Sequence, residues 1–203
     1  MTITNSKTHV AVRKAGASDR ATASAVLTAG FLDDPVTEWL VPDQRRRAEI
    51  APAMFGLYFD AFQPHGETYL TDDGAGTALW LPPGRELLAP DQLEEFGVRV
   101  QQVAGPDAGR VFELGEFFDA HAPAEPHWHL QLLAVRPDHQ GRGLGSVLLN
   151  DLLYRADRVG DAAYLEATTL RNRALYERHR FECIGRIVVP DGPPLWQMWR
   201  SPR

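Results

Sequence analysis

The stretch VRPDHQGRGLGSVLL, residues 135–149, decides what kind of domain this chain forms. It joins the end of one apolar run to the start of another, and it places Gly141, Gly143 and Gly145 around Arg142. Glycine lets a backbone approach a bulky anion without a clash from Cβ. Amide groups at the start of a helix attract negative charge, and the helix dipole adds to this attraction. The stretch therefore predicts a strand-to-helix loop that either cradles a phosphate group or is a tight turn that binds nothing.

Regular elements are expected on both sides of this loop. The run HWHLQLLAV (127–135) is rich in aliphatic residues and predicts a strand. The run at 146–160 predicts a helix whose apolar stripe is formed by Leu148, Leu149, Leu152, Leu153 and Ala156. A strand at 163–169, a short helix at 173–179 and strands at 182–189 and 195–200 should follow.

The upstream half alternates in a different order. We expect a strand at 9–15, a helix at 20–31, a helix at 42–62, a hairpin at 67–82 and helices at 90–104 and 106–120. Ser18 or Asp19 can cap the first helix, Pro35 ends that region, and Pro52 is expected to kink or split the second helix. This order predicts an α/β (α+β) layered domain with a mixed sheet.

Composition limits the classes of protein that the chain can belong to. Its 203 residues are 44% hydrophobic and carry a formal charge of −6, which suits one folded domain at 9–203 behind a flexible tail at 1–8. An acidic chain is not expected to bind nucleic acid. The polar N-terminus does not resemble a signal peptide, and no apolar run is long enough to predict a membrane span. A single cysteine suits a reducing compartment, so we expect a cytoplasmic protein without membrane association. We expect Cys183 to be a small buried residue, and no Cys/His spacing predicts a metal site.

Two common phosphate-binding patterns do not fit the loop. The Walker pattern requires Gly-Lys followed by Ser or Thr, which is absent. The dinucleotide fingerprint requires glycine at 146, where the chain has Ser146, although Glu166 would stand at the right distance for its ribose-binding acid. The loop also follows several long elements instead of a first strand.

The run Gln140 to Gly145 has the form Q/R-x-x-G-x-G/A, and it resembles the signature of the GNAT superfamily of acyl-CoA N-acyltransferases. The run LEATTLRNRALYERHRF (165–181) resembles the next motif of that family, with Asn172 and Tyr176 at the expected places. The segments FLDDP, TDDGAGTALWLPP and VVPDGPPLWQMWR look like the subfamily that contains puromycin N-acetyltransferase. The resemblance covers roughly residues 10–200.

This resemblance implies a fold and a donor. The fold has a mixed, mostly antiparallel central sheet of about six or seven strands, with helices on both faces and the fourth and fifth strands splayed. The donor is acetyl-CoA, whose pantetheine would lie between the splayed strands beside the backbone of Leu133, Ala134 and Val135. The other residues implied for the cofactor are Gln140, Gly141, Arg142, Gly143, Leu144, Gly145, Ser146 and Asn172, with Arg136 as an additional charge.

The same resemblance implies direct attack of an amine on the thioester. Tyr176 would protonate the departing thiolate, unless its ring only packs against the sheet, and a backbone N–H near Val135 would stabilise the carbonyl oxygen. The base stays open between His129, Glu166, the weaker candidate His127, and ordered water. By strand alternation, His129 and Gln131 should share a face with Leu133 and Val135. Glu166 has the alternative role of a hydrogen bond that holds the splayed strands.

The acceptor pocket is expected between the first two helices, in GFLDDPVTEWL (30–40). Aromatic and acidic residues there suit a cationic, partly apolar amine, and the candidates for substrate binding are Phe31, Asp34, Trp39 and Gln131. Asp34 in a turn and Trp39 in the core are the alternative roles.

One position departs from the family pattern. Where the family has Gly-Phe after its helix, this chain has Arg180-Phe181, so either Arg180 adopts positive φ or the helix ends differently.

We therefore expect an N-acetyltransferase that acts on the primary amine of a small molecule, with detoxification or antibiotic inactivation as its role. The alternatives are a protein or peptide N-acetyltransferase and a non-catalytic module that senses acyl-CoA. A homodimer could form through the edge LWQMW (195–199).

Overall fold

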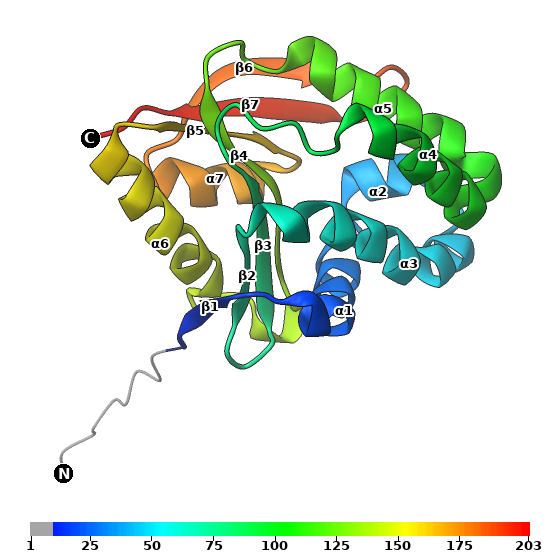
Figure 1. Cartoon of the computed structure of the whole chain (residues 1–203), viewed down its shortest axis with the longest axis horizontal. Helices are drawn as coiled ribbons and strands as arrows, with labels where there is room; N and C mark the ends of the chain where they lie inside the picture. Colours follow the sequence, from blue (N-terminus) through cyan, green and yellow to red (C-terminus); the bar gives the residue numbers. More distant parts are fainter. Residues whose placement is uncertain (1–9) are drawn as a thin grey trace.

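The computed structural model describes residues 10–203, so the tail expected at 1–8 lies outside the described residues. The helices and strands are, in chain order, β1 (Val12–Lys14), α1 (Arg20–Phe31), α2 (Pro35–Leu40), α3 (Gln44–Phe62), β2 (Thr68–Thr71), β3 (Gly76–Leu81), α4 (Pro90–Ala104), α5 (Ala108–His121), β4 (His127–Val135), α6 (Leu144–Val159), β5 (Ala162–Ala167), α7 (Leu170–Arg178), β6 (Glu182–Val188) and β7 (Pro194–Arg200). Figure 1 shows that the strands form one curved sheet between helices.

The sheet has seven strands in the order β1-β2-β3-β4-β5-β7-β6. Every neighbouring pair is antiparallel except β4 and β5, which are parallel. Helices α6 and α7 bury one face of the sheet, and helices α1 and α3 bury the other (Figure 1). The predicted mixed, mostly antiparallel sheet with helices on both faces is confirmed.

The strands β4 and β5 separate along their length. Their pairing covers only three positions, from His127 with Ala162 to His129 with Tyr164. Strand β4 continues to Val135 and β5 continues to Ala167 without further pairing between them. The predicted splay is therefore present, and it leaves the β5-facing side of Leu133–Val135 open.

A bulge in β4 changes which side chains share a face. Leu79 pairs with Leu132 and Trp80 pairs with Leu130, so Gln131 is an extra residue in β4. Leu133 and Val135 consequently pack against the α6 and α7 layer, while Leu132 and Ala134 pack against the α1 and α3 layer. The expectation that His129 and Gln131 share a face with Leu133 and Val135 is wrong, because the extra residue shifts the alternation by one.

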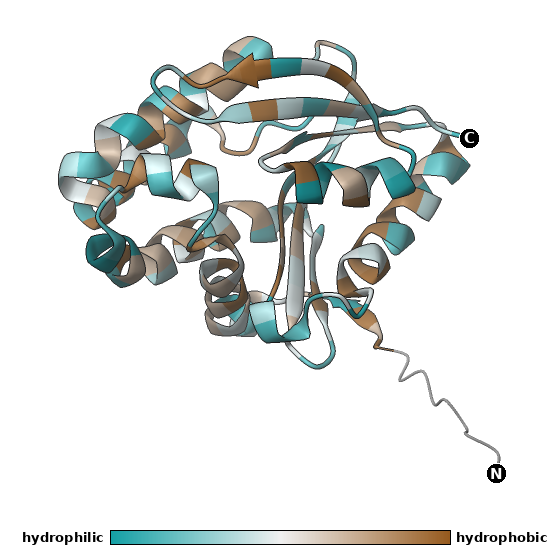
Figure 2. Cartoon of the chain, turned by 180° about the vertical axis from the view of Figure 1, so that it is seen from behind, coloured by the Kyte–Doolittle hydropathy of each residue, from teal (hydrophilic) through white to brown (hydrophobic). Residues whose placement is uncertain are grey.

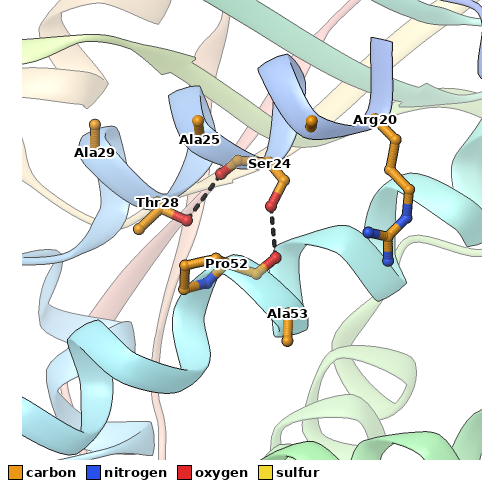
Figure 3. Close-up of a pocket in the computed structure, with 8 residues that line it drawn as sticks. Arg20, Ser24, Ala25, Thr28, Ala29, Pro52 and Ala53 are labelled. Carbon is orange, nitrogen blue, oxygen red and sulfur yellow. Dashed lines mark hydrogen bonds between the residues drawn. The ribbon is translucent and has the colours of Figure 1, made fainter. Parts of the chain in front are cut away.

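Pro52 lies inside α3 without splitting it, contrary to one of our expectations. The helix is continuous over Gln44–Phe62, and the Ser24 hydroxyl of α1 donates to the Pro52 carbonyl at 2.5 Å (Figure 3). The segment after Pro35, which lies between the first two predicted helices, forms the short helix α2. Asp19 precedes α1, but its carboxylate accepts from the Gly16 amide at 2.8 Å and does not cap that helix.

The sheet order corrects two further predictions. Strand β7 lies between β5 and β6, so LWQMW is not an edge, and Met198 is fully buried. The edge strand is β6, and Cys183 on it is exposed instead of buried. Figure 2 shows hydrophobic segments along this edge strand, where Ile184 and Val188 are exposed.

Candidate active site

The gap between β4 and β5 begins at a buried pair of polar side chains. His129 Nε2 lies 2.9 Å from Glu166 Oε2, and the two side chains are 17% and 6% exposed. The other carboxylate oxygen, Glu166 Oε1, is buried and has no hydrogen-bond partner within residues 10–203. Buried polar atoms are nearly always paired, so this oxygen marks a place where a further donor is expected.

Aromatic rings enclose the His129–Glu166 pair. The Tyr164 ring lies 5.4 Å from the His129 ring and 5.1 Å from the His127 ring, between centroids. The Gln197 side chain donates to the Tyr164 hydroxyl at 3.1 Å. Burial raises the pKa of Tyr164 and lowers the pKa of His127. Both side chains are therefore neutral near pH 7.

A second buried carboxyl, that of Asp34, lies at the end of β5. It caps α2, because its Oδ1 accepts from the Val36 amide at 2.9 Å, and its Oδ2 accepts from the hydroxyl of Thr168, which directly follows β5. Burial raises the pKa of Asp34 and therefore favours its neutral form more than in water.

Tyr176 lies on α7 beyond the end of β5. It is buried against Phe181, with 5.9 Å between ring centroids. No residue of the described chain forms a hydrogen bond with its hydroxyl. Burial, and after it the charge of Asp34, raises the pKa of Tyr176 above the ordinary value of 10. The phenol therefore keeps its proton throughout the physiological range.

The local sequence fixes how α7 begins and ends. Thr169 caps its start by accepting from the Asn172 amide at 3.1 Å, and Asn172 Nδ2 also donates to Thr168 Oγ1 at 3.4 Å. At its other end Arg180 adopts φ 67°, and the Phe181 amide donates to the Tyr176 carbonyl. Arg180 thus takes the left-handed conformation usually given to glycine, which settles the departure from the family pattern.

The loop before α6 has the backbone expected of an anion cradle. Gly141 and Gly143 have φ values of 75° and 86°, and a Cβ at either position would meet no atom within 4 Å. Gly143 is the N-cap of α6 and offers no side chain to the first amide groups of the helix. A Cβ at Gly145 would lie 3.2 Å from Leu175 Cδ2, so this glycine allows α6 and α7 to approach closely.

Several side chains of the loop already have partners in the protein. Gln140 Nε2 donates to the Val135 carbonyl at 3.1 Å, and Arg142 Nη2 donates to the Asp138 carbonyl at 2.9 Å. The Leu144 side chain is buried. Arg136 forms an exposed ion pair with Asp138. Leu144 can therefore offer only backbone groups to a ligand, whereas the side chains of Gln140, Arg142 and Ser146 each keep hydrogen-bonding capacity beyond their one bond within the protein.

The structure brings only part of the predicted acceptor set to the gap. Asp34 is joined to β5 through Thr168. Phe31 stacks on Phe55 at 5.7 Å between centroids, and Trp39 lies beneath Arg110 at 5.5 Å. Both rings also contact hydrophobic clusters, so their packing roles are established while contact with an acceptor stays a prediction. Gln131 occupies the bulge of β4.

A surface groove of about 540 Å³ lies elsewhere, between α1 and α3 (Figure 3). Small side chains line it, including Ser24, Ala25, Thr28 and Ala53. None of the predicted cofactor or acceptor residues is among those that line it. The polar pair in the β4–β5 gap is therefore a better candidate for chemistry than this groove.

Sequence reasoning missed three residues of the site. Thr168 directly follows β5, and its bond to Asp34 joins residues 134 positions apart, so no local pattern indicated it. Tyr164 precedes Glu166 at the spacing of one strand face, so alternation could have found it. His179, which bonds Ser146 at 2.9 Å, gave no local signal because its partner lies 33 residues away.

Two properties of the described residues bear on other classes of function. No helix within 10–203 is long and apolar enough to span a membrane. No group of three or more His, Cys, Asp and Glu side chains in that range is arranged to hold a metal ion.

Known proteins resemble this chain in sequence and fold. The model of the acetyltransferase (GNAT) family matches residues 38–181. An uncharacterized N-acetyltransferase of Schizosaccharomyces pombe is 26% identical over 183 residues, covering 85% of this chain and 74% of that protein.

Solved structures extend the likeness to the whole described chain. The structure of a histone acetyltransferase HPA2 and related acetyltransferase from Corynebacterium glutamicum has a TM-score of 0.72 and 28% identity, covering 96% of this chain and 97% of the other. An agmatine N-acetyltransferase has a TM-score of 0.68 and 16% identity, covering 95% and 99%. At that identity the second likeness concerns the fold alone.

Proposed function

Because the chain belongs to the GNAT acetyltransferase family, whose members use acetyl-CoA, we propose that it transfers the acetyl group directly to the primary amine of a small cationic molecule. The observation that carries this proposal is the His129–Glu166 pair, with its unpaired Oε1, where β4 and β5 separate.

On the donor side, the open backbone of Leu133, Ala134 and Val135 pairs with pantetheine. The pyrophosphate takes the amide groups from Gln140 to Ser146, including those of Gly141, Gly143 and Gly145. Support comes from the positive φ and free space at Gly141 and Gly143, which let the backbone approach an anion. Arg142 adds charge, and Asn172 contacts the donor from α7. Acetyl-CoA supplies the activated acyl group as a thioester.

On the acceptor side, two buried carboxylates attract an ammonium group. Glu166 Oε1 accepts one N–H of the amine. A cation beside Asp34 would favour the ionised form of this carboxyl, against the burial that raises its pKa. Phe31, Trp39 and Gln131 complete the pocket. A nearby cation stabilises a buried carboxylate, so both carboxyl groups favour a cationic acceptor over a neutral one.

The proposed reaction is one displacement accompanied by proton transfers. The ammonium first gives a proton to the His129–Glu166 pair, directly or through one water, and becomes a nucleophile. The amine nitrogen then forms a C–N bond as the C–S bond breaks, while a backbone N–H near Val135 stabilises the carbonyl oxygen. The nitrogen, now part of the amide, loses its second proton to solvent. Tyr176 gives its phenolic proton to the departing sulfur and regains one from solvent.

The identity and role of the acceptor are the finer part of the proposal. The resemblance of three segments to the puromycin N-acetyltransferase subfamily favours an aminoacyl nucleoside or a similar drug, with detoxification or antibiotic inactivation as the role. An agmatine N-acetyltransferase shares the fold and points to small cationic amines. We place the activity in the cytoplasm, in one catalytic domain at 9–203.

The test is thiol release from acetyl-CoA across a panel of puromycin, polyamines, arylalkylamines and short peptides. We expect turnover with small amines and at least about 10²-fold lower kcat/KM for Glu166→Gln. The matched control is Glu177→Gln, which removes an exposed carboxylate of α7. Preference for peptides would favour the protein-acetylating alternative. Binding of acetyl-CoA without turnover of any amine would favour the acyl-CoA sensor.

A further inference from the structure

A hydrogen bond joins the proposed anion cradle to the end of α7. His179 Nε2 lies 2.9 Å from Ser146 Oγ. Ser146 is in the first turn of α6, next to Gly145, and His179 is the C-cap of α7. The bond therefore lies where a phosphate group would meet the start of α6.

Three elements hold His179 in place. Its amide donates to the Tyr176 carbonyl at 2.8 Å, within the cap of α7. Its carbonyl accepts from Arg200 Nε of β7 at 3.1 Å. Arg200 also forms a two-pronged ion pair with Asp157 of α6, with N–O distances of 2.8 and 2.7 Å. The imidazole is thus presented to Ser146 by backbone contacts that do not depend on its ring.

The surroundings keep this imidazole neutral near pH 7. Burial, then the charges of Arg178 and Arg200, lower the pKa of His179. A neutral imidazole has one nitrogen that donates and one that accepts. Either Ser146 donates to Nε2, or Nε2–H donates to Ser146.

We propose that His179 is a positioning residue for the donor, because its Nε2–H holds the Ser146 oxygen and directs the hydroxyl proton to a phosphate of bound CoA. A phosphate oxygen only accepts hydrogen bonds, so a bound phosphate selects the arrangement in which Nε2–H donates. This inference rests on the proposed function, since it requires that the cradle binds the phosphates of CoA.

The test measures CoA binding by calorimetry for His179→Ala, Ser146→Ala, the double variant and His179→Gln. Loss of one hydrogen bond to a charged group should weaken CoA binding by about 10-fold or more in each single variant. The double variant should be no weaker than either single one, because both remove the same interaction. His179→Gln should recover most of the affinity, since its amide can donate to Ser146.

Two comparisons separate positioning from a purely structural role. S-acetylpantetheine lacks the phosphates, so its kcat/KM should be unchanged in His179→Ala. His65→Ala is the matched control, because it also loses a ring hydrogen bond, from His65 Nε2 to the Leu87 carbonyl at 3.0 Å. It should bind CoA as the wild type does.

Three outcomes would overturn the inference. Wild-type affinity for CoA in both His179→Ala and Ser146→Ala would leave the proposed function intact and remove this role. If His179→Ala lowered kcat/KM equally with acetyl-CoA and with S-acetylpantetheine, the bond would only hold α6 and α7 together and would have no role toward the phosphates. Absence of CoA binding by the wild type would overturn the proposed function and this inference with it.

Discussion

Gly30 lies in α1 where this helix crosses β4, and it gives the sharpest test of how the splayed strand is held. A Cβ at Gly30 would lie 2.8 Å from Ala134 Cβ, 3.5 Å from Ala134 Cα and 3.6 Å from the Val135 carbonyl oxygen. Carbon atoms in contact are ordinarily about 3.5–4.0 Å apart. The variant Gly30→Ala must therefore move α1 away from β4 by several tenths of an ångström or more.

Two opposing effects set the size of the change. Overpacking of this kind costs about 1–3 kcal/mol. Replacing glycine by alanine inside a helix is favourable by about 0.5–1 kcal/mol. Gly97→Ala in α4 is the matched control, because a Cβ there would meet no atom within 4 Å. The free energies of unfolding of the two variants should therefore differ by about 1–3 kcal/mol, with Gly97→Ala the more stable.

Equilibrium unfolding in urea, followed by circular dichroism, measures this difference. For a chain of this length it corresponds to about 2–4 °C in Tm per kcal/mol. Ala134→Gly removes the facing methyl group, so it should be less damaging in the Gly30→Ala background than in the wild type, by about 0.5 kcal/mol or more. Equal stability of Gly30→Ala and Gly97→Ala would refute the reasoning, as would additive effects of Gly30→Ala and Ala134→Gly.

Three further predictions concern Tyr176, Glu67 and Arg180. Tyr176→Phe should lower turnover by about 10²-fold or more while calorimetry shows unchanged CoA binding; unchanged turnover would remove the phenol from the mechanism. Burial raises the pKa of Glu67, but hydrogen bonds from Arg155, Tyr69 and Lys14 outweigh it and bring the pKa below 4.5. The stabilisation is therefore present above about pH 4.5 and is lost as the pH falls through the lowered value. Glu67→Gln should cost about 1–3 kcal/mol at pH 7, allowing for the partial exposure of Arg155, and Tm scans should show the difference shrinking toward pH 3; a constant difference would contradict this. Arg180→Gly should stabilise the fold by about 0.5–1 kcal/mol, since Arg180 has φ 67°, whereas Arg178→Gly inside α7 should destabilise it; thermal melting that gave both variants the same sign would contradict the assignment of the cap.

Local patterns in the sequence were sufficient for the helices other than α2, for the hairpin and for the loop before α6. The apolar stripe of α6 and the glycines at 141, 143 and 145 each act through neighbours in the chain, so a window of a few turns contains the signal. The resemblance added the splay of β4 and β5, which depends on how two distant strands meet.

What could not be predicted depends on partners that are distant in sequence. The run HWHLQLLAV contains no glycine or proline to announce the bulge at Gln131, which is defined by the register with Leu79 and Trp80. Cys183 is exposed because β7 takes the interior place in the sheet, an order that strand patterns do not specify. The contact of Asp34 with Thr168 spans 134 residues, so no local pattern could reveal it.

The bulge at Gln131 divides β4 into two halves, and the alternation of side chains between the two faces is shifted by one residue from the first half to the second. Before it, His129 faces the proposed acceptor pocket, and after it, Leu133 and Val135 face the layer of α6 and α7, which carries the proposed donor site. Each half also presents side chains to the other layer, because Leu130 packs in the α6 and α7 cluster and Leu132 packs in the α1 and α3 cluster. Deleting Gln131 would make the alternation regular and leave Leu130, Leu133 and Val135 in the layer that they occupy now. The extra residue therefore acts on the local bend and twist of β4, just after its pairing with β5 ends, and not on which layer its neighbours face.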